Sequence, residues 1–257
     1  MVTNEWHLKQ LILDIGKRLW QRGFIASNDG NITIRLDDNR LLTTPTGVSK
    51  GFMTPDMIIE MDLDGKVISG SGKYRPSSEV KMHIQVYRQR EDIRSVVHAH
   101  PPVCTSFAVA GIPLNRCVLP EAVLTLGAVP IAPYGTPSTR EIPDSIKSYL
   151  ENTDAILLAN HGALTLGTDL INAYHRMETL EHSAKIIFTA IQLGNVNMIP
   201  GPEVKKLMEI RQQMNIPGRI NVCGENGTCG NHQPGPPDET LISEITRLVM
   251  ERLKSQG

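Results

Sequence analysis

Two histidines separated by one small residue are the first feature of this chain that could do chemistry. His98 and His100 flank an alanine at the end of residues 95–100, a segment that begins with Ser-Val-Val and is stopped by two prolines. Alternate residues of a strand share a face, so we expect the two imidazoles side by side. Neutral imidazole is a ligand of zinc and of its neighbours among the divalent metals. Two strand-end histidines satisfied by water or backbone atoms would give the same pattern, so both interpretations stay open.

A third histidine and a glutamate extend the candidate metal site. His161 follows residues 155–159, an apolar run typical of a buried strand, and precedes a glycine. At such a strand end it could join the first two histidines, and three histidines leave a coordination position open, as in catalytic zinc sites. Glu79 follows two serines at the predicted start of a helix. It is the best candidate for a further ligand in the resting state.

The composition excludes several classes of protein. A chain of 257 residues can form one large domain with an ample core. Lys and Arg (26) nearly balance Asp and Glu (27), and no basic run predicts a nucleic-acid or membrane partner. No apolar stretch reaches the length of a transmembrane helix. The N-terminal segment has the spacing of an amphipathic helix instead of a signal peptide, so we expect a cytoplasmic enzyme.

Hydrophobic periodicity and turn residues predict alternating helices and strands. Helices are expected at residues 3–22, 77–90, 103–110 and 170–193. A hairpin is expected at 32–35 and 41–43, with further strands at 56–62, 67–68, 128–131 and 155–159 and a loop at 119–123. These expectations give a mixed α/β protein.

The last part of the chain differs in composition. A helix is predicted at 202–214, a long loop rich in Gly, Pro and Asn at 216–237, and an amphipathic helix at 238–254. The simplest division is a catalytic domain at 1–200 and a C-terminal extension at 201–257. Cys223, Cys229 and His232 fall in the predicted loop, and their spacing fits no standard zinc knuckle.

Two turn-rich loops flank the predicted hairpin. Gly30 and Asn31 lie in one, and the sequence Thr-Pro-Thr-Gly at 44–47 forms the other. Backbone amides of such small residues can form an anion-binding nest without any lysine. Ordinary turns are the alternative for either loop taken alone.

Several short motifs in this order and spacing resemble the class II aldolase/adducin family, and within it the fuculose-phosphate type of aldolase. The resemblance covers about residues 5–195. The motifs are Gly30-Asn31, Thr44-Pro45-Thr46-Gly47, Ser77-Ser78-Glu79, His98-Ala99-His100, Ala132-Pro133-Tyr134 with Thr139-Arg140-Glu141, and Asn160-His161-Gly162. The family implies a three-layer α/β/α fold with a central mixed, mostly antiparallel sheet. It also implies a homotetramer with active sites between subunits.

The resemblance also implies roles for individual residues. His98, His100 and His161 match ligands of Zn2+ or of a similar ion such as Mn2+ or Co2+. Glu79 matches a residue that binds the metal at rest and then acts as acid or base. The residues that match a phosphate pocket are Gly30, Asn31, Thr46, Gly47, Ser77 and Ser78. The implied reaction is cleavage of a small sugar phosphate, a ketose 1-phosphate of the fuculose or 5-deoxypentulose type, to dihydroxyacetone phosphate and an aldehyde.

The chain departs from the family pattern at one catalytic position. Fuculose-phosphate enzymes use a tyrosine from a neighbouring subunit, and Leu119 falls near that place. Glu121 is a candidate second acid/base, because related dehydratases carry a glutamate at a similar distance after the paired histidines. A surface glutamate is the alternative.

Three other functions remain open within the same fold. A pentulose-5-phosphate 4-epimerase typically has Asp at the position of Glu79 and Lys near Thr44, so both residues favour cleavage here. A dehydratase or decarboxylase could use the same metal site. An adducin-like interaction module lacks that site, and the presence of all three histidines with Glu79 argues against it.

Overall fold

The computed structural model of the protein describes residues 5–221. The predicted helix at 238–254, most of the predicted loop at 216–237, and Cys223, Cys229 and His232 lie outside this range.

An eight-stranded sheet forms the centre of the molecule. Its strands follow the order β4-β3-β2-β1-β5-β8-β7-β6, and every neighbouring pair is antiparallel except β6 and β7. The strands are β1 (Asn31–Arg35), β2 (Arg40–Thr43), β3 (Ile59–Asp62), β4 (Val67–Ser69), β5 (Ser95–Ala99), β6 (Ile131–Ala132), β7 (Ala155–Leu158) and β8 (Gly162–Gly167). The expected mixed, mostly antiparallel sheet is confirmed.

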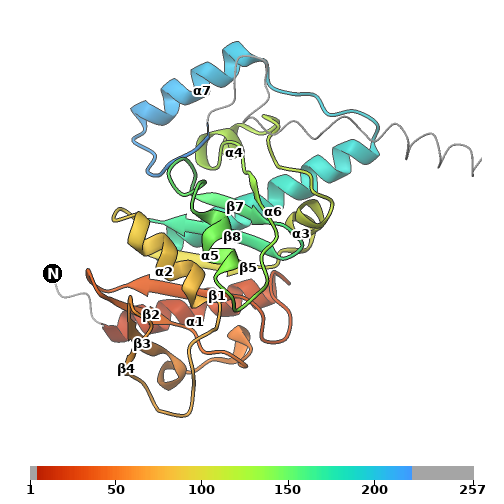
Figure 1. The fold of residues 1–257 in the computed structure, drawn as a ribbon. Helices are drawn as coiled ribbons and strands as arrows, with labels where there is room; N and C mark the ends of the chain where they lie inside the picture. Colours follow the sequence, from red (N-terminus) through yellow and green to blue (C-terminus); the bar gives the residue numbers. More distant parts are fainter. Residues whose placement is uncertain (1–4, 222–257) are drawn as a thin grey trace, which may run out of the picture.

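Helices cover both faces of this sheet and make three layers (Figure 1). On one face lie α1 (Glu5–Gln21), α3 (Pro102–Val109) and α6 (Leu170–Gln192), and on the other lie α2 (Val80–Gln89) and α5 (Glu141–Ile146). Side chains alternate between the two faces of β5, so that Val97 packs into the first core and Val96 into the second. The predicted three-layer α/β/α fold is therefore confirmed.

Two helices pack together beside the main sheet (Figure 1). A small apolar cluster joins α4 (Pro120–Thr125) to α7 (Gly201–Gln213) through Val123 and Val204. The chain then returns to the main body, where the amide of Ala128 donates to the carbonyl of Asn221 at 3.0 Å. Among the described residues, no helix combines the length and apolar character needed to cross a bilayer.

The local predictions needed three corrections. Residues 55–57 form a 3-10 turn, η2 (Pro55–Met57), and β3 begins only at Ile59. The segment predicted as a loop at 119–123 contains α4, which Pro120 begins at a first-turn position that needs no amide. The strand predicted at 128–131 is only the short β6. A further strand, β8, had no counterpart among the sequence-based predictions.

Candidate metal centre

The central strand β5 carries His98, and His100 follows directly after the end of the strand. Strand β5 pairs with β1 on one side and β8 on the other, and His98 near its end is fully buried. Nδ1 of His98 lies 2.9 Å from the carbonyl oxygen of Ala163. A carbonyl can only accept, so Nδ1 carries the hydrogen and the Nε2 lone pair remains free. Burial lowers the pKa of His98 well below its usual value, which keeps the ring neutral.

A tight turn between β7 and β8 presents the third histidine. Asn160 adopts a left-handed conformation (φ 55°), and His161 follows it. The next residue, Gly162, lies against the end of β5, where an added Cβ would stand 2.6 Å from the carbonyl oxygen of Ala99. This close approach brings His161 to the end of the strand that carries His98.

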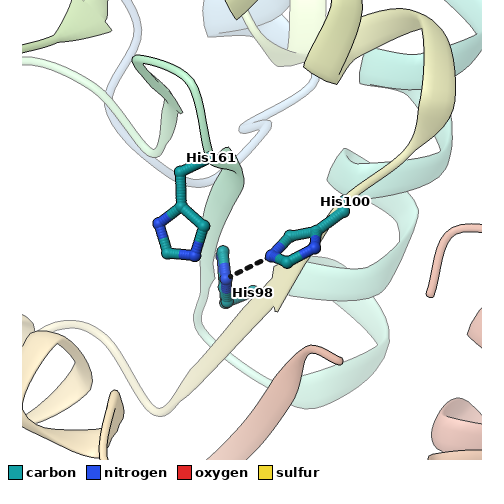
Figure 2. A group of neighbouring side chains, drawn as sticks. All are labelled: His98, His100 and His161. Carbon is teal, nitrogen blue, oxygen red and sulfur yellow. Dashed lines mark hydrogen bonds between the residues drawn. The ribbon is translucent and has the colours of Figure 1, made fainter. Parts of the chain in front are cut away.

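The three imidazoles converge on one point (Figure 2). One ligand nitrogen from each of His98, His100 and His161 lies within 4.8 Å of the others. The Nε2 atoms of His98 and His100 are 3.1 Å apart, and the three ring centroids are separated by 4.7 to 5.0 Å. The structure thus brings together the three histidines selected from sequence.

Glu79 reaches this cluster from the N-terminal end of α2. Its Oε1 lies 2.9 Å from Nε2 of His161, and its Oε2 lies 3.6 Å from Nε2 of His98. Nδ2 of Asn31 also donates to Oε2 at 3.1 Å. Burial alone would raise the pKa of Glu79, but the hydrogen bond from His161 and the nearby imidazoles lower the pKa to about 2. The group is therefore a carboxylate at neutral pH.

These four side chains fit a divalent metal. Neutral imidazole nitrogens with one carboxylate oxygen are the ligand types that zinc and similar ions prefer. Nδ1 of His161 is buried and has no hydrogen-bond partner within residues 5–221. The ligand roles of His98, His100, His161 and Glu79 remain predictions that this geometry favours.

One further carboxylate lies behind the cluster. Oδ2 of Asp29 is 3.5 Å from Nδ1 of His100, on the side of the ring away from His98 Nε2. A carboxylate in such a place orients a histidine ligand and strengthens its basicity. Asp29 was not predicted from the sequence, where only its position in a turn-rich loop distinguishes it.

The six predicted phosphate-pocket residues come from three adjacent segments. Gly30 directly precedes β1 and Gly47 lies in the loop after β2, and both have positive φ, 71° and 69°. Nδ2 of Asn31 donates to Oγ of Ser77 at 3.3 Å, which also accepts from the amide of Glu79 at 3.3 Å. Thr46 and Ser78 are exposed: the amide of Thr46 donates to the carbonyl oxygen of Arg75, and Oγ of Ser78 accepts a hydrogen bond from Ser138.

Glu121 is not drawn into this cluster. It lies in the first turn of α4 and is exposed, and its side chain makes no hydrogen bond or ion pair within the described chain. Its role as a second acid/base stays a prediction.

Two buried charged residues near the site were missed from the sequence. Lys50 is 2% exposed and Glu181 is 1% exposed. A lysine beside a Thr-Pro-Thr-Gly turn and a glutamate on an amphipathic helix are usually solvent-exposed, so neither had a distinguishing signal.

Comparison with known proteins identifies the family of this chain. Residues 10–188 match the class II aldolase and adducin N-terminal domain. A 3-oxo-tetronate 4-phosphate decarboxylase of Haemophilus influenzae is 31% identical over 203 residues, covering 77% of this chain and 95% of the relative. An L-fuculose phosphate aldolase of Methanococcus maripaludis is 35% identical over 174 residues, covering 68% and 92%.

The structural comparison agrees with the sequence comparison. The crystal structure of YgbL from Klebsiella pneumoniae superposes with a TM-score of 0.73 at 33% identity, covering 80% of this chain and 99% of that one. The sequence-based expectation of a lyase of the class II aldolase type is confirmed at the level of the family. The chain therefore belongs to the class II aldolase and adducin family.

Proposed function

We propose that the protein is a divalent-metal-dependent carbon–carbon lyase that releases dihydroxyacetone phosphate from a ketose 1-phosphate of the fuculose or 5-deoxypentulose type. The observation that carries the proposal is the carboxylate of Glu79, 2.9 Å from His161 at the edge of a cluster of three histidines. This arrangement offers a metal site and a proton carrier in one place.

The residues divide the work in the following way. The two loops around Gly30 and Gly47, with Ser77 and Ser78, bind the phosphate and fix the position of the three-carbon half of the substrate. His98, His100 and His161 hold the metal, with Zn2+, Mn2+ and Co2+ as candidates. A bound divalent metal supplies Lewis-acid polarisation of the substrate carbonyl.

Glu79 completes the reaction as the proton carrier. The bond between carbons 3 and 4 breaks when the hydroxyl on carbon 4 gives its proton to a base, for which Glu121 is the candidate, and the electron pair stays on carbon 3. Glu79, a carboxylate at rest, leaves its resting position, takes up a proton from water and delivers it to carbon 3, which gives dihydroxyacetone phosphate. In the resting position, the 3.1 Å hydrogen bond from Asn31 holds the carboxylate of Glu79 beside the histidines.

Decarboxylation is the second candidate, and the similarity of this chain to a 3-oxo-tetronate 4-phosphate decarboxylase favours it. Aldol cleavage needs a base for the departing hydroxyl, whereas a 3-oxo acid loses carbon dioxide from a carboxylate that is already ionised. Within residues 5–221, Glu121 makes no side-chain contact that would place it at the histidines. Loss of carbon dioxide from a 3-oxo-tetronate 4-phosphate also leaves dihydroxyacetone phosphate after protonation, so the same pocket and Glu79 would serve both reactions.

One screen separates these candidates. The metal-loaded protein is incubated with fuculose 1-phosphate, a 5-deoxypentulose 1-phosphate and 3-oxo-tetronate 4-phosphate, and dihydroxyacetone phosphate is detected by a coupled assay. We expect release from a ketose 1-phosphate together with an aldehyde. If carbon dioxide is released from 3-oxo-tetronate 4-phosphate and neither ketose 1-phosphate is cleaved, the reaction is decarboxylation and not aldol cleavage. A pentulose 5-phosphate control detects epimerisation, and conversion of that sugar without fragments would overturn both lyase reactions.

We further propose that the protein acts as a homotetramer with active sites between subunits. The exposure of Glu121 on α4 supports this, because an exposed glutamate is available to the site of a neighbouring subunit. Mass measurement in solution tests the tetramer. A stable monomer with full activity would contradict it.

A further inference from the structure

A buried lysine joins the two loops assigned to the phosphate. Lys50 is 2% exposed, although lysine is rarely buried without a carboxylate partner. Its Nζ donates to the carbonyl oxygens of Asn28 at 2.6 Å and Val48 at 3.0 Å. Asn28 lies in the loop before β1 and Val48 in the loop after β2, so one ammonium group connects both loops.

The charge of this lysine has no close neutralising partner. Within the described residues, no carboxylate lies at ion-pair distance from Nζ of Lys50, and its two hydrogen-bond acceptors are neutral carbonyls. Burial lowers the pKa of Lys50 to about 8, while the charges of Asp29 and Glu79 act in the opposite direction. An ammonium in this position is costly for the free protein, because a buried charge is stable only when it is compensated.

The proposed phosphate pocket lacks a positive charge of its own. None of its six residues is cationic, yet a sugar phosphate carries a charge of about −1.5 to −2 at neutral pH. Building on the proposed function, we infer that Lys50 is a positioning residue for phosphate recognition, which ties the two loops together and places a positive charge behind them. The incoming phosphate supplies the countercharge that the free protein lacks.

The test compares two ligands that differ only in the phosphate. Binding of dihydroxyacetone phosphate and of dihydroxyacetone to the metal-loaded full chain is measured by calorimetry for wild type and Lys50→Met. We expect the dissociation constant of the phosphorylated ligand to rise roughly tenfold, because a partly buried charge interaction is lost. Binding of dihydroxyacetone and the metal content should stay the same. Lys66→Met, which removes an exposed lysine from the turn between β3 and β4, is the matched control and should change the dissociation constant of neither ligand.

Two further variants separate charge from tethering. Lys50→Arg keeps the charge and should recover most of the affinity for the phosphate, whereas Lys50→Gln keeps donors without charge and should recover little. If Lys50→Met does not fold, this Arg–Gln comparison gives the same answer. Recovery by Gln as complete as by Arg would overturn the role of the charge.

Other outcomes would also overturn the inference. Unchanged affinity for dihydroxyacetone phosphate in Lys50→Met, or equal weakening of both ligands, would show that Lys50 does not serve the phosphate. If wild type bound dihydroxyacetone phosphate and dihydroxyacetone with equal affinity, the assignment of the phosphate pocket itself would be wrong. Wild type that prefers the phosphorylated ligand but cleaves no sugar phosphate would refute the proposed function and leave the role of Lys50 intact.

Discussion

At the scale of single residues, Glu79 is the side chain on which the proposed chemistry depends. Glu79→Gln keeps the size and one ligating oxygen but cannot carry a proton. General acid/base groups contribute about 10²–10⁴-fold, so we expect turnover to fall by that order with the metal still bound. In heavy water, wild type should exchange a hydrogen on the hydroxymethyl carbon of dihydroxyacetone phosphate, and the variant should not. Exchange that persists in Glu79→Gln would move the proton carrier elsewhere, with Glu121 the first alternative.

The two serines before Glu79 differ in how cleanly they test the phosphate pocket. Ser77 also holds Asn31 and the amide of Glu79, so its removal would disturb the metal centre. Ser78 is exposed, and among the described residues its side chain has a hydrogen bond only with Ser138. Ser78→Ala should therefore raise KM for a phosphorylated substrate with little change in kcat, because the lost contact is remote from the reacting bond. Ser138→Ala is the control, and equal KM effects from both would place the contact outside the pocket.

At the scale of elements, a glutamate on one helix caps another helix that begins beside the metal centre. Glu181 of α6 accepts hydrogen bonds from the amides of Val103 and Cys104, at 3.1 and 2.9 Å, in the first turn of α3. Glu181→Ala would leave these amides unpaired, which should cost about 1–3 kcal/mol in the free energy of unfolding. Because α3 starts just after His100, metal affinity should also fall. Chemical denaturation and metal titration measure both effects.

The neighbouring residue provides the control for this prediction. His182 lies on the exposed side of α6, so His182→Ala should change stability by less than about 0.5 kcal/mol. Glu181→Ala with the stability of the control would show that α3 does not need the cap.

The elements also show where sequence-based prediction succeeded and where it failed. The long helices and the hairpin were predicted because each has one clear apolar face or alternation, as in α6 and β1. Strand β8 escaped because glycines bound it at both ends. Gly162 and Gly167 are there for close packing, since an added Cβ at Gly167 would lie 2.4 Å from the amide nitrogen of Ala173. Such contacts form only in the tertiary structure. In the sequence alone, the two glycines indicate an interruption and not a strand.

The residues of the candidate site also divide into those that one element positions and those that two loops position together. The spacing of His98 and His100 on a strand, and of His161 after another, was enough to bring the three together in prediction. Lys50 and Asp29 were missed, because their significance arises from loops that meet only after folding. Local patterns reveal residues that act through one element, and they do not reveal residues that act between elements.

At the scale of the whole molecule, the proposed metal centre lies on a sheet that has its own cores on both faces. Removal of the metal should therefore abolish turnover and leave far-ultraviolet circular dichroism nearly unchanged, unlike a zinc finger. The unfolding temperature should fall, because a ligand that binds only the folded state stabilises it. Loss of secondary structure on chelation would contradict this prediction, and re-addition of metal with recovery of activity is its control.

The pairing of β5 with β8 has a consequence for how the chain folds. His98 and His161 are about sixty residues apart. A loop of that length must close before both histidines can bind the same metal ion and change its absorption. Contacts between distant segments form slowly compared with helices. Refolding in the presence of Co2+ should therefore show helical dichroism first and the visible absorption of the bound ion later, with a delay that lengthens when pairing of β5 with β8 is weakened. The time at which the visible absorption of the ion appears would then report the time at which the central sheet closes.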